Sequence, residues 1–147
     1  MDNLSKLGIW INRIVIVAVS ILFSMIGIRN ITHPLQNSMQ SGIALNSATA
    51  LSVARVSMGA FPLAFAIILL TGLLIKKQLL GAILSVFIII VITTAVRIAS
   101  LQLDGHSDFG VQVLKPEIMI TIFSTIGLYL ELRRRRMESS SVHSKTN

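Results

Sequence analysis

Long apolar runs separated by charged residues dominate the chain. Residues 56–75 form an uncharged run of 20, and a second uncharged run of 18 covers residues 79–96. Runs of this length without charge are typical of membrane-spanning helices. The pattern predicts two spans, at about residues 53–75 and 79–103, joined by a tight hairpin over residues 76–78.

A third span is predicted near the N-terminus, at about residues 7–28. Its uncharged part, residues 14–28, lies between Arg13 and Arg29, whose long side chains can reach the two membrane surfaces. A cleaved signal peptide is the alternative interpretation, but no small-x-small cleavage site follows this run at residues 25–32. This favours a retained membrane anchor.

The fourth predicted span ends in four consecutive arginines, residues 133–136. Because the uncharged run 118–130 is too short to cross a bilayer alone, the helix is expected to begin earlier, with Ser107 or Asp108 as N-cap and Pro116 as an internal kink. The alternative is a shorter helix, about 25 Å long, that begins at Pro116.

We therefore expect an all-α fold, an integral membrane four-helix bundle. Its transmembrane domain covers residues 1–132, with the last helix at about 108–132, and residues 133–147 form a basic and then disordered tail. The polar segment 30–52 reads as a loop, with a short interfacial helix around residues 35–45 as the alternative.

Composition agrees with a membrane protein. Hydrophobic residues make up 53% of the chain and charged residues 13%, which leaves too little polar surface to cover a soluble globule. The net charge of +7 does not indicate a nucleic-acid partner, because the basic residues flank apolar spans instead of lining a polar face. The chain contains no cysteine, so disulfide and thiolate chemistry are excluded.

The distribution of Lys and Arg predicts the orientation of the spans. With four spans, both termini and the hairpin 76–78 share one side, which holds nine Lys and Arg residues, and the other side holds Arg29, Arg55, Arg97 and Lys115. The positive-inside rule therefore places both termini in the cytoplasm of a bacterium and the protein in its inner membrane, with residues 30–52 and 104–108 outside.

Four charged residues are predicted to lie near one level at the outer surface, and a fifth lies further out. Residues equidistant from a tight turn in antiparallel helices lie at the same height, so the turn at 104–108 pairs Arg97 with Glu117. The turn near Lys77 places Arg55 at almost the same height, helix 1 brings Arg29 there, and Asp104 lies a turn or two further out. The candidate polar cluster thus consists of Arg29, Arg55, Arg97, Asp104 and Glu117.

Two interpretations of this cluster stay open. The charges are ordinary interfacial side chains, with Arg97 and Glu117 paired to lower the cost of lying between helices. Alternatively, three guanidinium groups facing one carboxylate leave positive charge uncompensated and form a site for an anionic lipid or metabolite.

Other candidate sites are weaker. Asp104, His106 and Asp108 alternate along the chain as metal ligands can, but they also fit a turn and a helix cap. The arginine run 133–136 fits both a stop-transfer signal and a site for anionic lipid. No catalytic residue, metal or cofactor is predicted.

Short motifs in residues 53–130 resemble an uncharacterised family of small bacterial four-helix membrane proteins that is distantly DoxX-like. In that family an Arg precedes a Gly on helix 2, a second Arg precedes an Asp-Gly turn, and a Glu follows on helix 4. The matching residues here are Arg55, Gly59, Arg97, Asp104, Gly105 and Glu117. The chain departs from the family at Ala60, where a second glycine is usual, and lacks the proline often found after Asp-Gly. The resemblance implies the four-helix fold and no particular reaction.

The sequence thus predicts a non-enzymatic inner-membrane protein that binds an anionic lipid or metabolite or uses the cluster as a structural lock. A small oligomeric transporter is the alternative, although helix 1 has no carboxylate to couple protons and only Glu117 remains for that role. A membrane enzyme acting on lipid head groups ranks third, with Asp104, His106 and Glu117 as its acid/base groups. Membrane lipid and a second copy of the chain are the expected partners.

Overall fold

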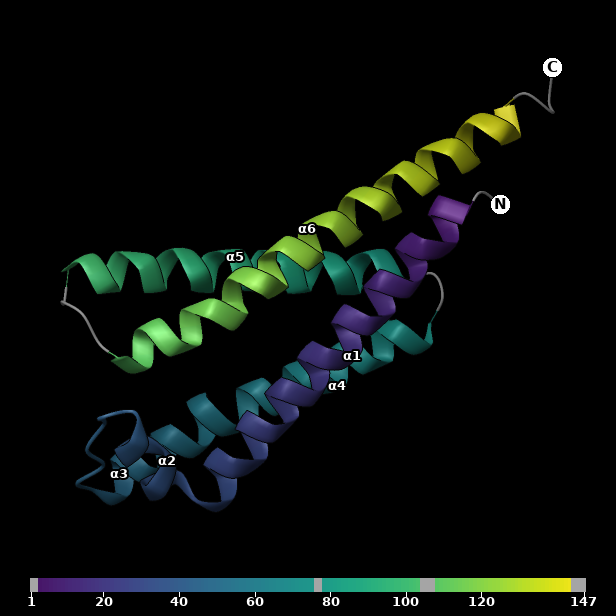
Figure 1. Cartoon of the computed structure of the whole chain (residues 1–147). Coiled ribbons are helices and arrows are strands. Elements are labelled where there is room, and N and C mark those ends of the chain that lie inside the picture. The colour runs from purple at the N-terminus through teal and green to yellow at the C-terminus, as the bar shows by residue number, and fades with distance from the viewer. Residues whose placement is uncertain (1–2, 76–77, 104–107, 144–147) are drawn as a thin grey trace. The chain divides into compact units, whose positions relative to one another are not determined.

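Every regular element in the computed structural model is helical across the residues it describes, which are 3–75, 78–103 and 108–143 (Figure 1). The elements are α1 (Asn3–Thr32), α2 (Pro34–Gln40), α3 (Ala48–Ala54), the π-helical segment η1 (Arg55–Ala60), α4 (Phe61–Leu74), α5 (Leu79–Leu103) and α6 (Asp108–His143).

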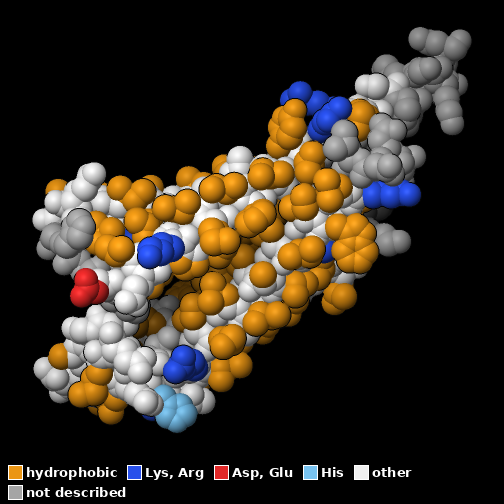
Figure 2. All heavy atoms as spheres, viewed as in Figure 1, with side chains coloured by type: hydrophobic (Ala, Val, Ile, Leu, Met, Phe, Trp, Pro, Cys, Tyr) orange, Lys and Arg blue, Asp and Glu red, His pale blue; other side chains and the backbone are white. Residues whose placement is uncertain are grey.

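Four stretches of helix are long and apolar enough to cross a membrane. They are Lys6–Thr32, Ala48–Leu74, Leu79–Leu103 and Gly110–Met137. Large hydrophobic side chains such as Trp10, Ile67 and Ile92 are exposed on these helices, and Figure 2 shows hydrophobic side chains over much of the visible helical surface. The predicted all-α fold with four membrane-length helices is confirmed.

The segment between the first two spans contains more helix than the sequence predicted. Pro34 begins α2, where its fixed backbone angle and missing N–H suit a first helical residue. Gly42 then ends α2 with a positive φ of 73°, and the N–H of Ile43 donates to the carbonyl of Ser38. This is a Schellman ending, for which glycine is the favoured residue.

The second span begins at residue 48 and not near residue 53. Ser47 caps it, since its Oγ accepts a hydrogen bond from the N–H of Ala50 at 3.0 Å. Further along, the N–H of Phe61 donates to the carbonyl of Val56, five residues earlier. This π-type turn lies directly ahead of Pro62, which has no N–H to donate to Met58, and it makes the helix irregular near the proline.

The last helix is longer than the sequence predicted. Pro116 lies inside α6, so the long form of this helix is correct and the alternative start at Pro116 is wrong. The prediction of a helix end near residue 132 and of disorder beyond Met137 is also wrong as far as His143. Arginine, methionine and glutamate are good helix formers, and Glu131 pairs with Arg134 and Arg135 along the helix.

The chain divides into two compact units. We call Met1–Ile16 with Ile75–Asn147 the α5–α6 unit, and Val17–Leu74 the α4 unit. In the first, α5 and α6 run antiparallel and pack on each other (Figure 1), and Ile16, Ile83 and Val86 are fully buried. In the second, the rings of Phe23 and Phe65 meet edge to face with centroids 5.4 Å apart.

Candidate functional site

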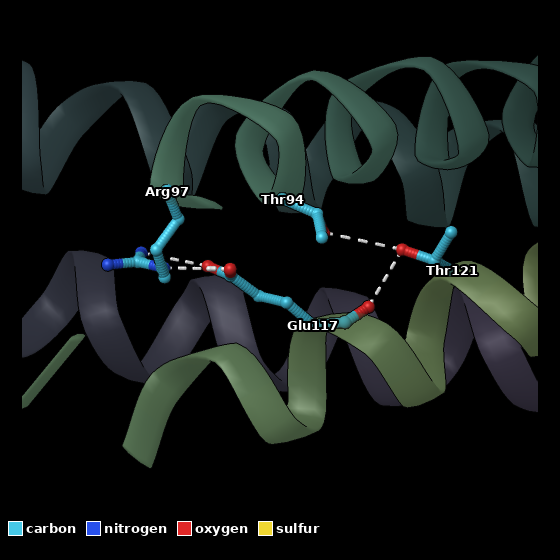
Figure 3. Close-up of polar contacts among 4 residues, drawn as sticks. All are labelled: Thr94, Arg97, Glu117 and Thr121. Atoms are coloured by element: carbon cyan, nitrogen blue, oxygen red, sulfur yellow. Dashed lines mark hydrogen bonds and ion pairs between the residues drawn. The ribbon is translucent and has the colours of Figure 1, made fainter. Parts of the chain in front are cut away.

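The predicted pair of Arg97 and Glu117 is present in the α5–α6 unit. Arg97 donates two hydrogen bonds to the Glu117 carboxylate, from Nε to Oε2 at 2.7 Å and from Nη2 to Oε1 at 2.8 Å (Figure 3). Glu117 is buried, and the Arg97 side chain is 26% exposed. The prediction that Arg97 on α5 lies beside Glu117 on α6 is thus confirmed.

A second polar contact follows the ion pair toward the middle of the helices. Thr121 lies one turn from Glu117 on α6, and its Oγ1 donates to the Glu117 carbonyl at 2.8 Å. The hydroxyls of Thr94 and Thr121 lie 3.4 Å apart between α5 and α6 (Figure 3). Both carboxylate oxygens of Glu117 accept hydrogen bonds from Arg97, so this part of the cluster is a charge-neutral link between two helices.

Arg29 and Arg55 lie in the α4 unit, close to one level. A Cβ added to Gly59 would meet the backbone of both Gly27 and Ile31, so Gly59 lies level with the midpoint between them, at the height of Arg29. Arg55 lies four residues before Gly59, about 6 Å further along the axis. Arg29 and Arg55 therefore lie about one helical turn apart along the helix axis, and their predicted place in one layer stays a prediction.

Neither of these two arginines is neutralised. Both side chains are exposed, and among the described residues neither guanidinium has a hydrogen-bond or ion-pair partner. The sequence contains no Asp or Glu between residues 3 and 103. The α4 unit consequently has no carboxylate of its own to offset Arg29 and Arg55.

The structure describes only some of the remaining candidate residues. Asp104 and His106 lie outside the described residues, and Asp108 is exposed in the first turn of α6, where a negative charge favours the helix dipole. No group of three or more His, Cys, Asp or Glu that could hold a metal occurs in the described part of the chain. The convergence of all five cluster residues on one layer stays a prediction.

Sequence reasoning missed two buried polar residues in the α5–α6 unit. Glu131 is 1% exposed and binds Arg134 and Arg135, and Asn12 is fully buried against α6. A helical spacing signal existed, because Glu117, Ser124 and Glu131 recur every seven residues and all are buried. Glu131 also fits the end of a span, because the arginine run 133–136 follows it closely in the sequence.

Comparison with known protein families, with curated proteins and with solved structures finds no match to this chain. The resemblance to small four-helix membrane proteins stays a prediction.

Proposed function

We propose that this chain is a non-enzymatic, multi-pass protein of the bacterial inner membrane that binds the phosphate of an anionic lipid head group through Arg29 and Arg55. The observation that carries the proposal is the pair of exposed, unneutralised guanidinium groups in a unit without a carboxylate. An anion supplied from outside the chain would provide the missing negative charge.

The chemistry of arginine fits a phosphate ligand. A guanidinium group donates two parallel hydrogen bonds to phosphate oxygens and stays charged at every physiological pH. Arg29 lies in the last turn of α1 and Arg55 near the start of the second span, which is where head groups lie beside a spanning helix. Two arginines about one helical turn apart can contact a single phosphate from two sides.

The neighbouring structure supports a binding role for Arg55. Arg55 is the first residue of the π-helical segment η1, and such single-turn widenings are frequent at functional sites. Arg97 is not included in the proposed site, because Glu117 already occupies its Nε and Nη2 groups.

Lipid-dependent stability tests this proposal. Phosphatidylglycerol added to the detergent-purified protein should raise its melting temperature more than phosphatidylcholine does, because a ligand that binds only the folded state stabilises it. Arg29→Gln and Arg55→Gln should each lose most of that difference. Arg13→Gln removes the same charge from another exposed position, in the first half of α1, and should keep that difference.

Native mass spectrometry of the same proteins counts the lipids retained. The two site variants should each retain fewer phosphatidylglycerol molecules than the Arg13→Gln control. If free glycerol phosphate stabilises the wild type equally well, the ligand is a soluble phosphate and not a lipid. Equal lipid retention and stabilisation in wild type and Arg55→Gln would contradict the site and leave the arginines as ordinary interfacial charges.

A further inference from the structure

The α5–α6 unit contains a buried carboxamide without a partner. Asn12 on α1 has an exposed fraction of 0%, and neither its Nδ2 nor its Oδ1 has a hydrogen-bond partner among the described residues. A buried amide without a hydrogen-bond partner is costly, and a buried polar group within a membrane-length helix is a candidate functional group. Asn12 therefore needs a partner in some state of the protein.

The opposing surface of α6 is shaped around this amide. Asn12 lies against Gly127, and a Cβ added to Gly127 would overlap Asn12 Oδ1. Gly8, one turn before Asn12 on α1, lies against Leu130, about one turn after Gly127 on α6. The two helices therefore run antiparallel here. Glycine at position 127 is thus the residue that leaves room for the Asn12 side chain beside α6.

Glu131 lies one turn beyond Gly127 on the same face of α6. Its side chain is fully buried, and its carboxylate accepts hydrogen bonds from Arg134 Nη2 at 2.7 Å, from Arg134 Nε at 3.1 Å and from Arg135 Nε at 3.1 Å. Both arginines lie on the side of Glu131 that leads toward the end of α6. The Arg135 side chain is 39% exposed, so this guanidinium group connects the buried carboxylate to the protein surface on that side.

A second arrangement of Glu131 is available toward Asn12. Side chains on a helix lean toward its N-terminus, so another rotamer of Glu131 lies back over position 127, where glycine has no side chain to block it. Four residues of helix rise about 6 Å, a distance that a glutamate and an asparagine side chain can bridge together.

The two groups can form a reciprocal pair of hydrogen bonds only when Glu131 is protonated. A carboxylic acid has one O–H donor and one carbonyl acceptor, and a primary carboxamide has the complementary N–H donor and carbonyl acceptor. The two groups then form a pair of hydrogen bonds. An ionised carboxylate has no donor for Oδ1, so it binds Arg134 and Arg135 instead.

We propose that Glu131 is a proton-binding site whose carboxyl group exchanges between Arg134 and Arg135 when ionised and Asn12 when protonated. One proton from the aqueous side of the arginine run binds one carboxylate oxygen, and both guanidinium groups stay protonated at the solvent end of α6. Release of the proton reverses each step. Protonation thus moves the Glu131 side chain by about one helical turn toward the interior of the span.

Among the described residues of the three helices that pack here, few other charged groups are present. Helix α5 has no titratable residue between positions 79 and 96, and α1 contributes Lys6 and Arg13, both exposed. On α6 itself, Arg133 and Arg136 flank the two contacting arginines, Tyr129 is exposed, and Glu117 is bound to Arg97 two heptads away.

The pH dependence of stability tests the exchange through Asn12→Leu. Above the pH at which Glu131 binds its proton, leucine replaces an amide that has no hydrogen-bond partner, so the variant should melt at a higher temperature than the wild type. Below that pH the wild type gains the acid–amide pair and the variant does not, so the variant should melt lower than the wild type. The sign of the effect should therefore reverse with pH.

Ser20→Ala is the matched control, because Ser20 lies further along α1 and its buried Oγ also lacks a partner among the described residues. With no carboxylic acid to pair with, its effect should keep one sign at every pH. Infrared spectroscopy supplies a second measurement, in which the spectrum of Glu131→Gln is subtracted from that of the wild type to remove the bands of the other carboxyl groups. The carboxylic-acid carbonyl band that remains should appear on acidification and require a pH lower by about one unit in Asn12→Leu. An Asn12→Leu effect of one sign at all pH values, or the absence of any carboxylic-acid band from the difference between wild type and Glu131→Gln, would overturn the proposal.

Discussion

At the scale of single residues, the ion pair between Arg97 and Glu117 makes a quantitative prediction. Replacing either residue by glutamine leaves the other charge partly buried without a partner, which costs roughly 3 kcal/mol for a buried pair. The double variant Arg97→Gln/Glu117→Gln leaves no such charge and should lose less stability than the sum of the two single variants. Unfolding of the four proteins in the same detergent measures this, and simple additivity would show that the two side chains do not interact.

The same residues show how far sequence reasoning reaches. Arg97 and Glu117 were paired correctly because a tight turn fixes the register of the two helices that it joins. The proximity of Asn12 and Glu131 was missed because no turn joins α1 directly to α6. Counting residues from a turn therefore cannot show which residues of these two helices lie side by side. The sequence pattern still indicates that Asn12 is buried, because Asn12 lies on the same helical face as the apolar residues Val15, Ile16 and Val19, which are buried.

At the scale of helices, the close approach of α1 to η1 depends on the small size of Gly59. A Cβ there would lie 2.7 Å from Ile31 Cγ1 and 3.2 Å from the Ile31 backbone nitrogen, so Gly59→Ala should force the helices apart and lower stability by about 1–3 kcal/mol. Gly81 on α5 is the matched control, because nothing lies within 4 Å of an added Cβ. Gly81→Ala should be neutral or stabilising by up to about 1 kcal/mol, since alanine favours helix. Melting curves of the two variants should differ in this direction, and equal losses would contradict the close packing.

The helix boundaries show which local signals the sequence left ambiguous. The span at 79–103 was predicted with its observed bounds because apolar residues fill it and charged or polar segments flank it. The start of the second span was missed because residues 48–52 contain Thr and Ser, which hydrogen-bond locally and fit loops as well as helices. The C-terminal extension of α6 was missed because the tail lacks an apolar face, while good helix formers and the contacts of Glu131 with Arg134 and Arg135 suffice to continue it.

At the scale of the whole molecule, the orientation of the spans decides which leaflet the proposed lipid site meets. The nine Lys and Arg residues on one side and four on the other predict that both termini are cytoplasmic. Arg29 and Arg55 then face the outer leaflet, whereas Glu131 and the arginine run 133–136 face the cytoplasm. The anion site and the proton site would consequently lie at opposite ends of the spans.

Reporter fusions measure this orientation directly. Alkaline phosphatase is active only outside the cytoplasm, so a fusion after Gly42, in the turn that ends α2, should be active and a fusion after Asn147 should be inactive. Green fluorescent protein at the same two positions is the control and should give the opposite pattern. The reverse result for both reporters would place Arg29 and Arg55 at the cytoplasmic leaflet, where anionic lipid is also available, and would move the proton access of Glu131 to the outer surface. The chemistry proposed for each site would survive that reversal, because it depends on local contacts, but the direction from which each ligand arrives would be exchanged.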